Sequence, residues 1–109
     1  MAKIRLVNKH FRGWHRPGEV AIDICRPTVL GNSHYLHDPN NLVERKAVID
    51  AYRADLDNDF KFKGSMHKAV MGIVAKLEEG NDVALLCWCH PKPCHGDVII
   101  EKVKQLMKI

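Results

Sequence analysis

One apolar run near the C-terminal end constrains the fold more than any other feature of this sequence. Residues 83–89 (Val-Ala-Leu-Leu-Cys-Trp-Cys) follow Asp82 with no charged or amide side chain among them. A strand buried on both faces loses the alternation of a one-sided strand, so this run predicts a central strand over about 82–89. A turn with two prolines follows, and then an amphipathic segment. A strand, a rigid turn and a helix in direct succession are typical of an α/β domain.

The rest of the chain supplies further strands and helices for that sheet. Alternating residues over 4–7 and 19–25 predict two short strands. Periodic apolar positions predict three helices, over about 41–56, 66–79 and 97–108. Asn41 and Glu44 are expected to form a capping box at the first helix, and Ser65 to cap the second. We therefore expect a small α/β sandwich with a three- or four-stranded sheet, formed as a single domain by residues 1–109.

Composition narrows the functional classes. No apolar stretch approaches the roughly 20 residues that span a bilayer, and no signal-peptide segment follows the N-terminus, so we expect a cytoplasmic protein with no membrane partner. The net charge of +4 favours a phosphate-bearing partner only mildly and supports nucleic acid weakly, through the basic segment 8–18. Four cysteines in such a chain are expected to be reduced, which favours metal binding or thiol chemistry over disulfides.

Three of those cysteines lie close together in residues 87–95, and the residues alone leave three interpretations open. In the first, zinc is held by Cys87, Cys89, Cys94 and His95, with His90 as an alternative ligand, because three thiolates and an imidazole form a tetrahedral set. In the second, Cys94 is a nucleophile or redox thiol activated by the start of the last helix, with His95 or His90 as proton carrier. In the third, Cys87 and Cys89 are small core residues.

Three segments of the chain resemble a phage and bacterial family, domain of unknown function 4326. Residues 86–99 (Leu-Cys-Trp-Cys-His-Pro-Lys-Pro-Cys-His-Gly-Asp-Val-Ile) resemble its signature L-x-C-W-C-x-P-x-x-C-H-G-D-x-L. Residues 26–33 resemble its R-P-S-x-x-G-N-P element, with Ser33 where the family usually has proline, and residues 44–53 its R-x-x-A-V-x-x-Y-R helix. The resemblance implies a phage or bacterial protein that is located in the bacterial cytoplasm. It does not indicate which reaction, if any, the protein catalyses.

The predicted topology brings these segments to one edge of the sheet. Ligands of open α/β sheets bind at the carboxyl ends of the strands, where Cys25 and the Cys87–His95 turn are expected. We predict a pocket for a nucleotide, nucleoside or modified base, or another small phosphate- or carboxylate-bearing ligand. Its ligand-binding residues are Arg26, Gly31, Asn32 and Arg45, and its catalytic residues are Cys94, His95 and Asp97.

The same residues allow other interpretations than a ligand pocket. A zinc-stapled module that binds a host protein or nucleic acid is the rival function, with zinc as the candidate cofactor. Arg26 and Arg45 are also open to a purely structural interpretation, in which they form ion pairs with Asp23, Asp50 or Asp97. Trp88 is expected to be a core anchor more readily than a base-stacking platform.

Overall fold

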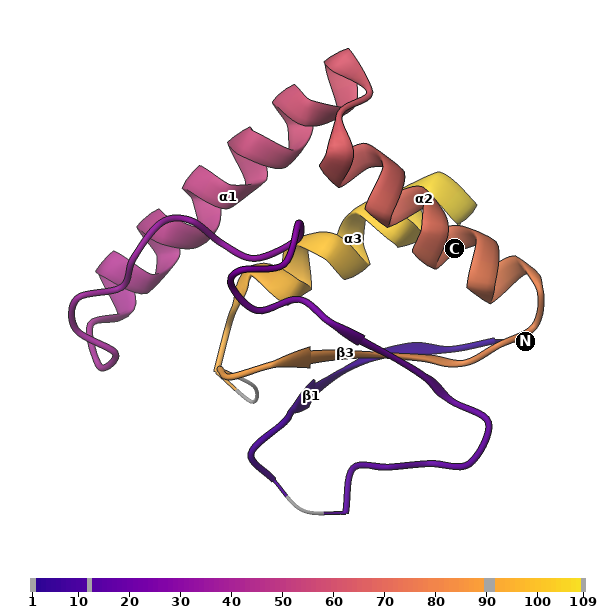
Figure 1. The fold of residues 1–109 in the computed structure, drawn as a ribbon. Coiled ribbons are helices and arrows are strands. Elements are labelled where there is room, and N and C mark those ends of the chain that lie inside the picture. The colour runs from indigo at the N-terminus through magenta and orange to yellow at the C-terminus, as the bar shows by residue number, and fades with distance from the viewer. Residues whose placement is uncertain (1, 12, 90–91, 109) are drawn as a thin grey trace.

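The predicted central strand lies in the middle of a parallel sheet. A computed structural model describes residues 2–11, 13–89 and 92–108 (Figure 1). Strand β3 (Val83–Cys87) lies between β1 (Ile4–Asn8) and β2 (Val20–Asp23). Both pairings are parallel, and Leu85 is in register with Leu6 of β1 and Ile22 of β2. The expected α/β class is confirmed, with three strands in the sheet.

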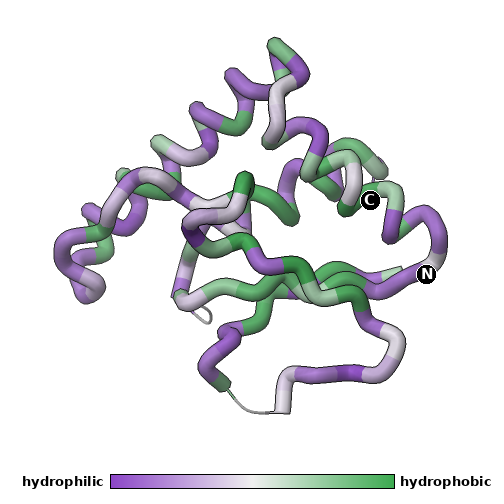
Figure 2. Tube along the Cα trace, in the orientation of Figure 1, coloured by the Kyte–Doolittle hydropathy of each residue, from purple (hydrophilic) through white to green (hydrophobic). Residues whose placement is uncertain are grey.

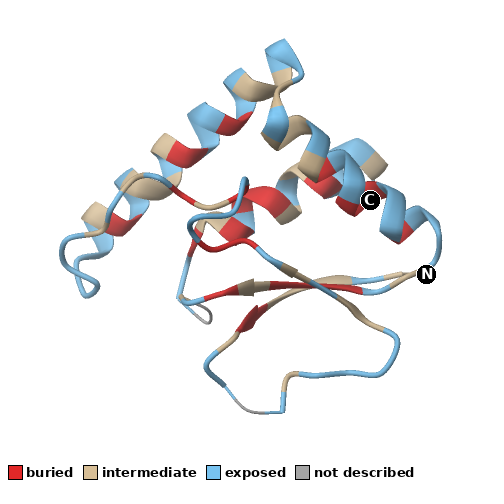
Figure 3. Ribbon diagram, viewed as in Figure 1, coloured by how far each residue is buried: buried red, intermediate tan, exposed pale blue. Residues whose placement is uncertain are grey.

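Different parts of the chain cover the two faces of the sheet. Figure 1 shows helices α1 (Leu42–Phe62), α2 (Ser65–Glu78) and α3 (His95–Met107) on one side and the β1–β2 connection on the other. Within that connection, Glu19 and the Trp14 carbonyl oxygen accept hydrogen bonds from Arg5. Central strand β3 is therefore buried along nearly its whole length (Figure 3).

The hydrophobic core lies between the sheet and the helices. Figure 2 shows apolar residues gathered on the sheet and on the helix turns that approach it. The largest fully buried side chains come from every layer, and they include Ile24, Tyr52, Leu56, Ile73, Leu85 and Ile99. None of the described helices combines the length and apolar character that crossing a membrane requires.

Helix α1 is longer than the sequence predicts. We expected it to end near residue 56 and a polar connection to follow over 57–65, but α1 continues to Phe62 and ends at Lys63 in a left-handed conformation (φ 52°). The polar residues stay helical because Asp59 has a tertiary role, accepting a hydrogen bond from the His67 amide in the first turn of α2. Ser65 is consequently not the cap of α2, and Gly64 takes that position without a side-chain hydrogen bond.

The junction between β3 and α3 also differs from the prediction. The strand ends at Cys87, two residues before the predicted end, and α3 begins at His95 instead of near residue 97. Cys94 is the N-cap, and its sulfur accepts a hydrogen bond from the Gly96 amide at 3.3 Å. Asp97 completes a capping box by accepting from the Cys94 amide at 3.0 Å. These paired hydrogen bonds favour an earlier helix start than apolar periodicity indicates.

The loop before α1 is held to the helix by polar contacts. Asn41 caps α1 as predicted, accepting from the Glu44 amide at 3.0 Å. Glu44 reaches back further than a capping box requires, because its carboxylate accepts from the amides of His37 and Asp38. Deeper in the core, the Tyr52 hydroxyl donates to the Leu30 carbonyl oxygen at 2.8 Å. These bonds dock the loop at the carboxyl edge of the sheet.

Gly31 is expected to tolerate no side chain in this loop. A Cβ atom there would lie 2.8 Å from the Arg26 amide nitrogen and 2.9 Å from its Cα, so Gly31→Ala should lower the free energy of unfolding by about 1–3 kcal/mol. Gly72→Ala is the matched control, because nothing lies within 4 Å of that exposed helical position, and alanine should raise stability by about 1 kcal/mol. Urea unfolding followed by circular dichroism measures both, and equal effects of the same sign would contradict the tight contact.

Candidate functional site

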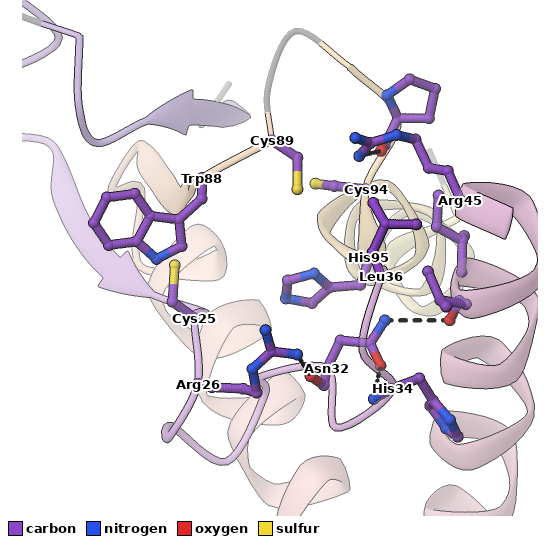
Figure 4. Close-up of a pocket in the computed structure, with 13 residues that line it drawn as sticks. Cys25, Arg26, Asn32, His34, Leu36, Arg45, Trp88, Cys89, Cys94 and His95 are labelled. Carbon is purple, nitrogen blue, oxygen red and sulfur yellow. Dashed lines mark hydrogen bonds between the residues drawn. The ribbon is translucent and has the colours of Figure 1, made fainter. Parts of the chain in front are cut away.

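A cavity of about 290 Å³ opens at the carboxyl edge of the sheet. Three segments line it: residues within 25–36 after β2, residues within 45–49 of α1, and residues 88–89 and 93–95 at the junction of β3 and α3 (Figure 4). The structure thus brings together Arg26, Asn32, Arg45, Cys94 and His95, which the sequence analysis selected. Val48 and Ile49 also line the cavity as half-buried residues, and Ile49 packs against the hydrophobic core as well.

Three thiols lie in contact beside this cavity. Cys94 hydrogen-bonds with both Cys87 and Cys89, and it is only 2% exposed. Cys87 is fully buried at the end of β3, whereas Cys89 is half-buried and lines the cavity. In Figure 4 the sulfur atoms of Cys89 and Cys94 point toward each other. The accessible member of the cluster is therefore Cys89.

Their surroundings shift the pKa values of the two facing thiols, Cys89 and Cys94, in opposite directions. The pKa of Cys89 falls to about 6, first because Cys94 hydrogen-bonds to its sulfur, and also because Arg45 hydrogen-bonds to it and the charges of Arg45 and Lys92 favour the thiolate. The pKa of Cys94 is raised, because its hydrogen bonds to Cys87 and Cys89 and its burial all favour the protonated thiol. These pKa shifts favour a state in which the protonated Cys94 thiol donates a hydrogen bond to the Cys89 thiolate.

His95 is held as a neutral imidazole. Its Nε2 atom lies 2.7 Å from the Ile24 carbonyl oxygen, which can only accept, so Nε2 carries the proton. Burial lowers the pKa of His95, and the nearby charge of Arg26 lowers it further. The ring packs edge-on against Tyr52, with 4.9 Å between ring centres. Nδ1 has no hydrogen-bond partner among the residues described, which leaves it free to accept a proton.

Arg45 is a buried cation without a buried anion opposite it. The residue is 5% exposed, and its guanidinium donates to the carbonyl oxygens of Pro93 at 3.1 Å and Pro39 at 2.9 Å. No carboxylate of the described residues pairs with it, and its Nε atom has no hydrogen-bond partner there. The guanidinium also hydrogen-bonds to the Cys89 sulfur, whose thiolate its charge favours.

Arg26 stands on the opposite side of the cavity. It donates to the Asn32 carbonyl oxygen at 2.6 Å, and its guanidinium lies 4.2 Å from the ring centre of Tyr35. The ion pairs that would have made the two arginines purely structural are absent from the described residues, because the carboxylates in question have other partners. Asp23 pairs with Lys9, Asp50 with Lys46 and Arg53, and Asp97 caps α3.

Three of the selected residues have visible structural roles. The side chain of Asn32 donates to the Val48 carbonyl oxygen and accepts from the His34 amide, so both ends of its amide group are occupied. Gly31 permits the close approach of the loop to Arg26. Asp97 holds the Cys94 amide. These residues position the cavity wall, and sequence patterns alone did not separate that role from ligand contact.

The four side chains of the zinc hypothesis are only partly brought together. Cys87, Cys89 and Cys94 are in contact, but the Nε2 atom of His95 is engaged with Ile24. Among the residues that the structure describes, no group of three or more His, Cys, Asp or Glu side chains has an arrangement suited to a metal ion. His90, the alternative ligand and proton carrier, lies outside the described residues.

Trp88 lies at the cavity and not in the core. Its side chain lines the opening and the residue is 48% exposed, in contrast to the predicted core anchor. The His10 ring packs against it at a tilt, with 3.6 Å between ring centres, and the Lys9 ammonium lies 4.3 Å from the centre of the indole ring. The strand ends before Trp88, which explains the difference: the residue is no longer held in the buried alternation of β3.

Comparison with known proteins identifies the family. The model of the family described as domain of unknown function (DUF4326) matches residues 6–105. The chain belongs to this family. A similar protein is an uncharacterised 12.4 kDa protein in the nrdA-td intergenic region of Enterobacteria phage T4, which is 32% identical over 104 residues, or 95% of this chain and 81% of the phage protein. No solved structure matches this DUF4326 chain. The matched region contains all three segments that line the cavity.

The thiol geometry predicts a characteristic pH profile for alkylation. The rate of Cys89 labelling by iodoacetamide should rise with pH around a midpoint of about 6, because the thiolate is the nucleophile. Arg45→Met should move the midpoint to higher pH, since the lost charge had favoured the thiolate. Cys25, whose pKa burial raises to about 12, should stay unlabelled at neutral pH. Mass spectrometry of the peptides measures each site separately.

A matched control and an opposing result complete this test. Arg53→Met removes a cation that pairs with Asp50 and Glu101, away from the cavity, and should leave the midpoint unchanged. A Cys89 midpoint near the ordinary thiol value of about 8.5 in the unaltered protein would contradict the arrangement.

Proposed function

We propose that the cavity binds a small nucleotide, whose phosphate is held by Arg45 and Arg26 and whose base lies against the apolar wall. The observation that carries this proposal is the buried guanidinium of Arg45, which has no carboxylate partner among the described residues. Burying a charge without a carboxylate partner is costly, and an anionic ligand at the cavity offsets that cost beyond what the Cys89 sulfur supplies. A guanidinium also matches phosphate geometry through paired N–H donors.

The other walls of the cavity support a base-bearing ligand. Leu36, Val48 and Ile49 supply apolar surface, and the indole of Trp88 supplies an aromatic face at the opening. Ligand pockets generally range from roughly 300 to 1,000 Å³, so a cavity of about 290 Å³ suits a small ligand better than a dinucleotide. A cation on one side and apolar surface on the other suit a molecule with a phosphate at one end and a base at the other.

The cavity also contains the groups of an enzyme-like site. Sequence reasoning selected Cys94 and His95 as the reactive pair. The arrangement of the thiols supports a revised assignment, in which Cys89 is the nucleophile and Cys94 donates a hydrogen bond to it. His95 remains the proton acceptor, since its neutral ring keeps Nδ1 available. Asp97 serves this site by capping α3.

A nucleic-acid interface on the β1–β2 connection has weaker support. Lys9 pairs with Asp23 at 2.9 Å, and Arg5, at the base of this connection, pairs with Glu19 at 2.7 Å. A phosphate backbone would have to displace those carboxylates, whereas Arg26 and Arg45 pair with no carboxylate among the described residues. The charge distribution therefore favours the small ligand.

Nucleotide binding is tested by isothermal titration calorimetry with a panel of nucleoside monophosphates and their parent nucleosides. At least one monophosphate should bind more tightly than its nucleoside, and Arg45→Met should weaken that binding about 10- to 100-fold, the equivalent of one lost charged hydrogen bond. The affinity should fall as salt is raised.

Two further variants keep this test decisive. Arg26→Ala, at an exposed position, should weaken monophosphate binding without disturbing the core, whereas Arg53→Met should leave it unchanged. Thermal unfolding confirms that each variant is folded. The proposal fails if no monophosphate binds at millimolar concentration, or if nucleosides bind as tightly as their monophosphates.

A further inference from the structure

The facing thiols of Cys89 and Cys94 form a pair that the binding of a nucleotide does not require. They come from opposite ends of the turn that joins β3 to α3, and their sulfur atoms point toward each other (Figure 4). Cys89 lies beyond the last residue of β3, so a bond between the two sulfurs leaves the pairing of the sheet intact. Two thiols in contact at the edge of an open cavity are arranged for two-electron chemistry.

We propose that Cys89 and Cys94 act as a dithiol that reduces small disulfides and is itself converted to a Cys89–Cys94 disulfide. The substrate class is a low-molecular-weight disulfide with anionic groups, such as glutathione disulfide. This activity rests on the two sulfur atoms and their surroundings. It shares Cys89 and Arg45 with the proposed nucleotide site but does not require a nucleotide to bind.

The two cysteines have different surroundings, which assigns their roles. Cys89 is the half-buried member that lines the cavity, so an incoming disulfide reaches it first. The cations Arg45 and Lys92 beside Cys89 favour its thiolate and attract anionic groups on the substrate. Cys94 is buried and held at the N-cap of α3, where it contacts Cys89 but not the solvent. Cys89 is therefore the attacking thiol and Cys94 the resolving thiol.

The reaction balances in two steps. The Cys89 thiolate attacks one sulfur of the substrate disulfide, forming a mixed disulfide and releasing the other half as a thiolate. Cys94 then attacks the Cys89 sulfur, the bond to the bound half of the substrate breaks, and the Cys94 proton leaves with that half as a thiol. The two protein thiols are oxidised by two electrons, and the substrate disulfide is reduced to two thiols. A thiol reductant reverses the sequence and restores the protein.

The remaining cysteines supply internal controls. Cys25 also lines the cavity, but it is 4% exposed and its sulfur donates to the Leu86 carbonyl oxygen at 3.5 Å. Cys87 contacts Cys94 but is fully buried within β3. Both are less accessible to a substrate than Cys89, so we expect neither to start the reaction.

The test incubates the fully reduced, full-length protein with glutathione disulfide and follows it by intact mass and by peptide mapping. The unaltered protein should lose two hydrogens, release two glutathione molecules and yield a Cys89–Cys94 linked peptide. Cys94→Ser should stop at a glutathione adduct on Cys89, and this variant keeps a good N-cap because serine also caps helices. Cys89→Ser should form neither the adduct nor the internal disulfide, and Cys25→Ser should behave as the unaltered protein does.

Several outcomes would overturn the proposal. One is a linked peptide that joins Cys94 to Cys87, and another is a Cys94→Ser protein that takes up no glutathione on Cys89. Metal analysis of the untagged protein before the reaction adds a third: one tightly bound zinc per chain together with thiols inert to glutathione disulfide would assign the cluster to the metal. Since nucleotide titration uses different variants and a different readout, failure of either proposal leaves the other to be judged separately.

Discussion

The N-cap of α3 is the interaction on which the rest of the site depends. The sulfur of Cys94 accepts from the Gly96 amide, and Asp97 accepts from the Cys94 amide, so the first turn of the helix is fixed around Cys94. Cys94 in turn contacts Cys87 at the end of β3. Gly96 is packed so closely that a Cβ atom would lie 2.2 Å from Leu6 of β1. Any larger residue there would force the Leu6 side chain to shift. One consequence is that Cys94 meets Cys87 and Cys89 in the interior, and His95 reaches back to Ile24.

A buried cation without a carboxylate partner among the described residues is the second organising feature of the cavity. Arg45 is buried on the sheet side of α1, where carbonyl oxygens and the Cys89 sulfur are its partners. The same guanidinium therefore favours the Cys89 thiolate and, under the proposed function, attracts the anionic ligand. A carboxylate in that place would have neutralised the cation and raised the pKa of Cys89. The absence of such a carboxylate from the described surroundings gives the cavity its chemical character.

The sequence predicted the elements of the fold better than their ends. The apolar run of β3 and the periodic faces of the helices reflect burial, which produces a recognisable pattern of apolar residues in the sequence. The ends of α1 and the start of α3 depend on single contacts, Asp59 with the His67 amide and Asp97 with the Cys94 amide. The second of these spans only three residues, but a cysteine cap is not a common N-cap signal. The partner of Asp59 lies in another helix, which local patterns do not reveal.

For this protein the sequence by itself determined the α/β class and the family, and it directed attention to the Cys-rich turn that lines the cavity, because burial periodicity and motif spacing are local properties. Only the tertiary structure decided which thiol is accessible, which histidine nitrogen carries the proton and which arginine has no carboxylate partner among the described residues. Each of these depends on groups far apart in the chain, such as Arg45 beside Pro93 or His95 beside Ile24. Ionisation and hydrogen bonding respond to distance in space, and the fold alone sets that distance.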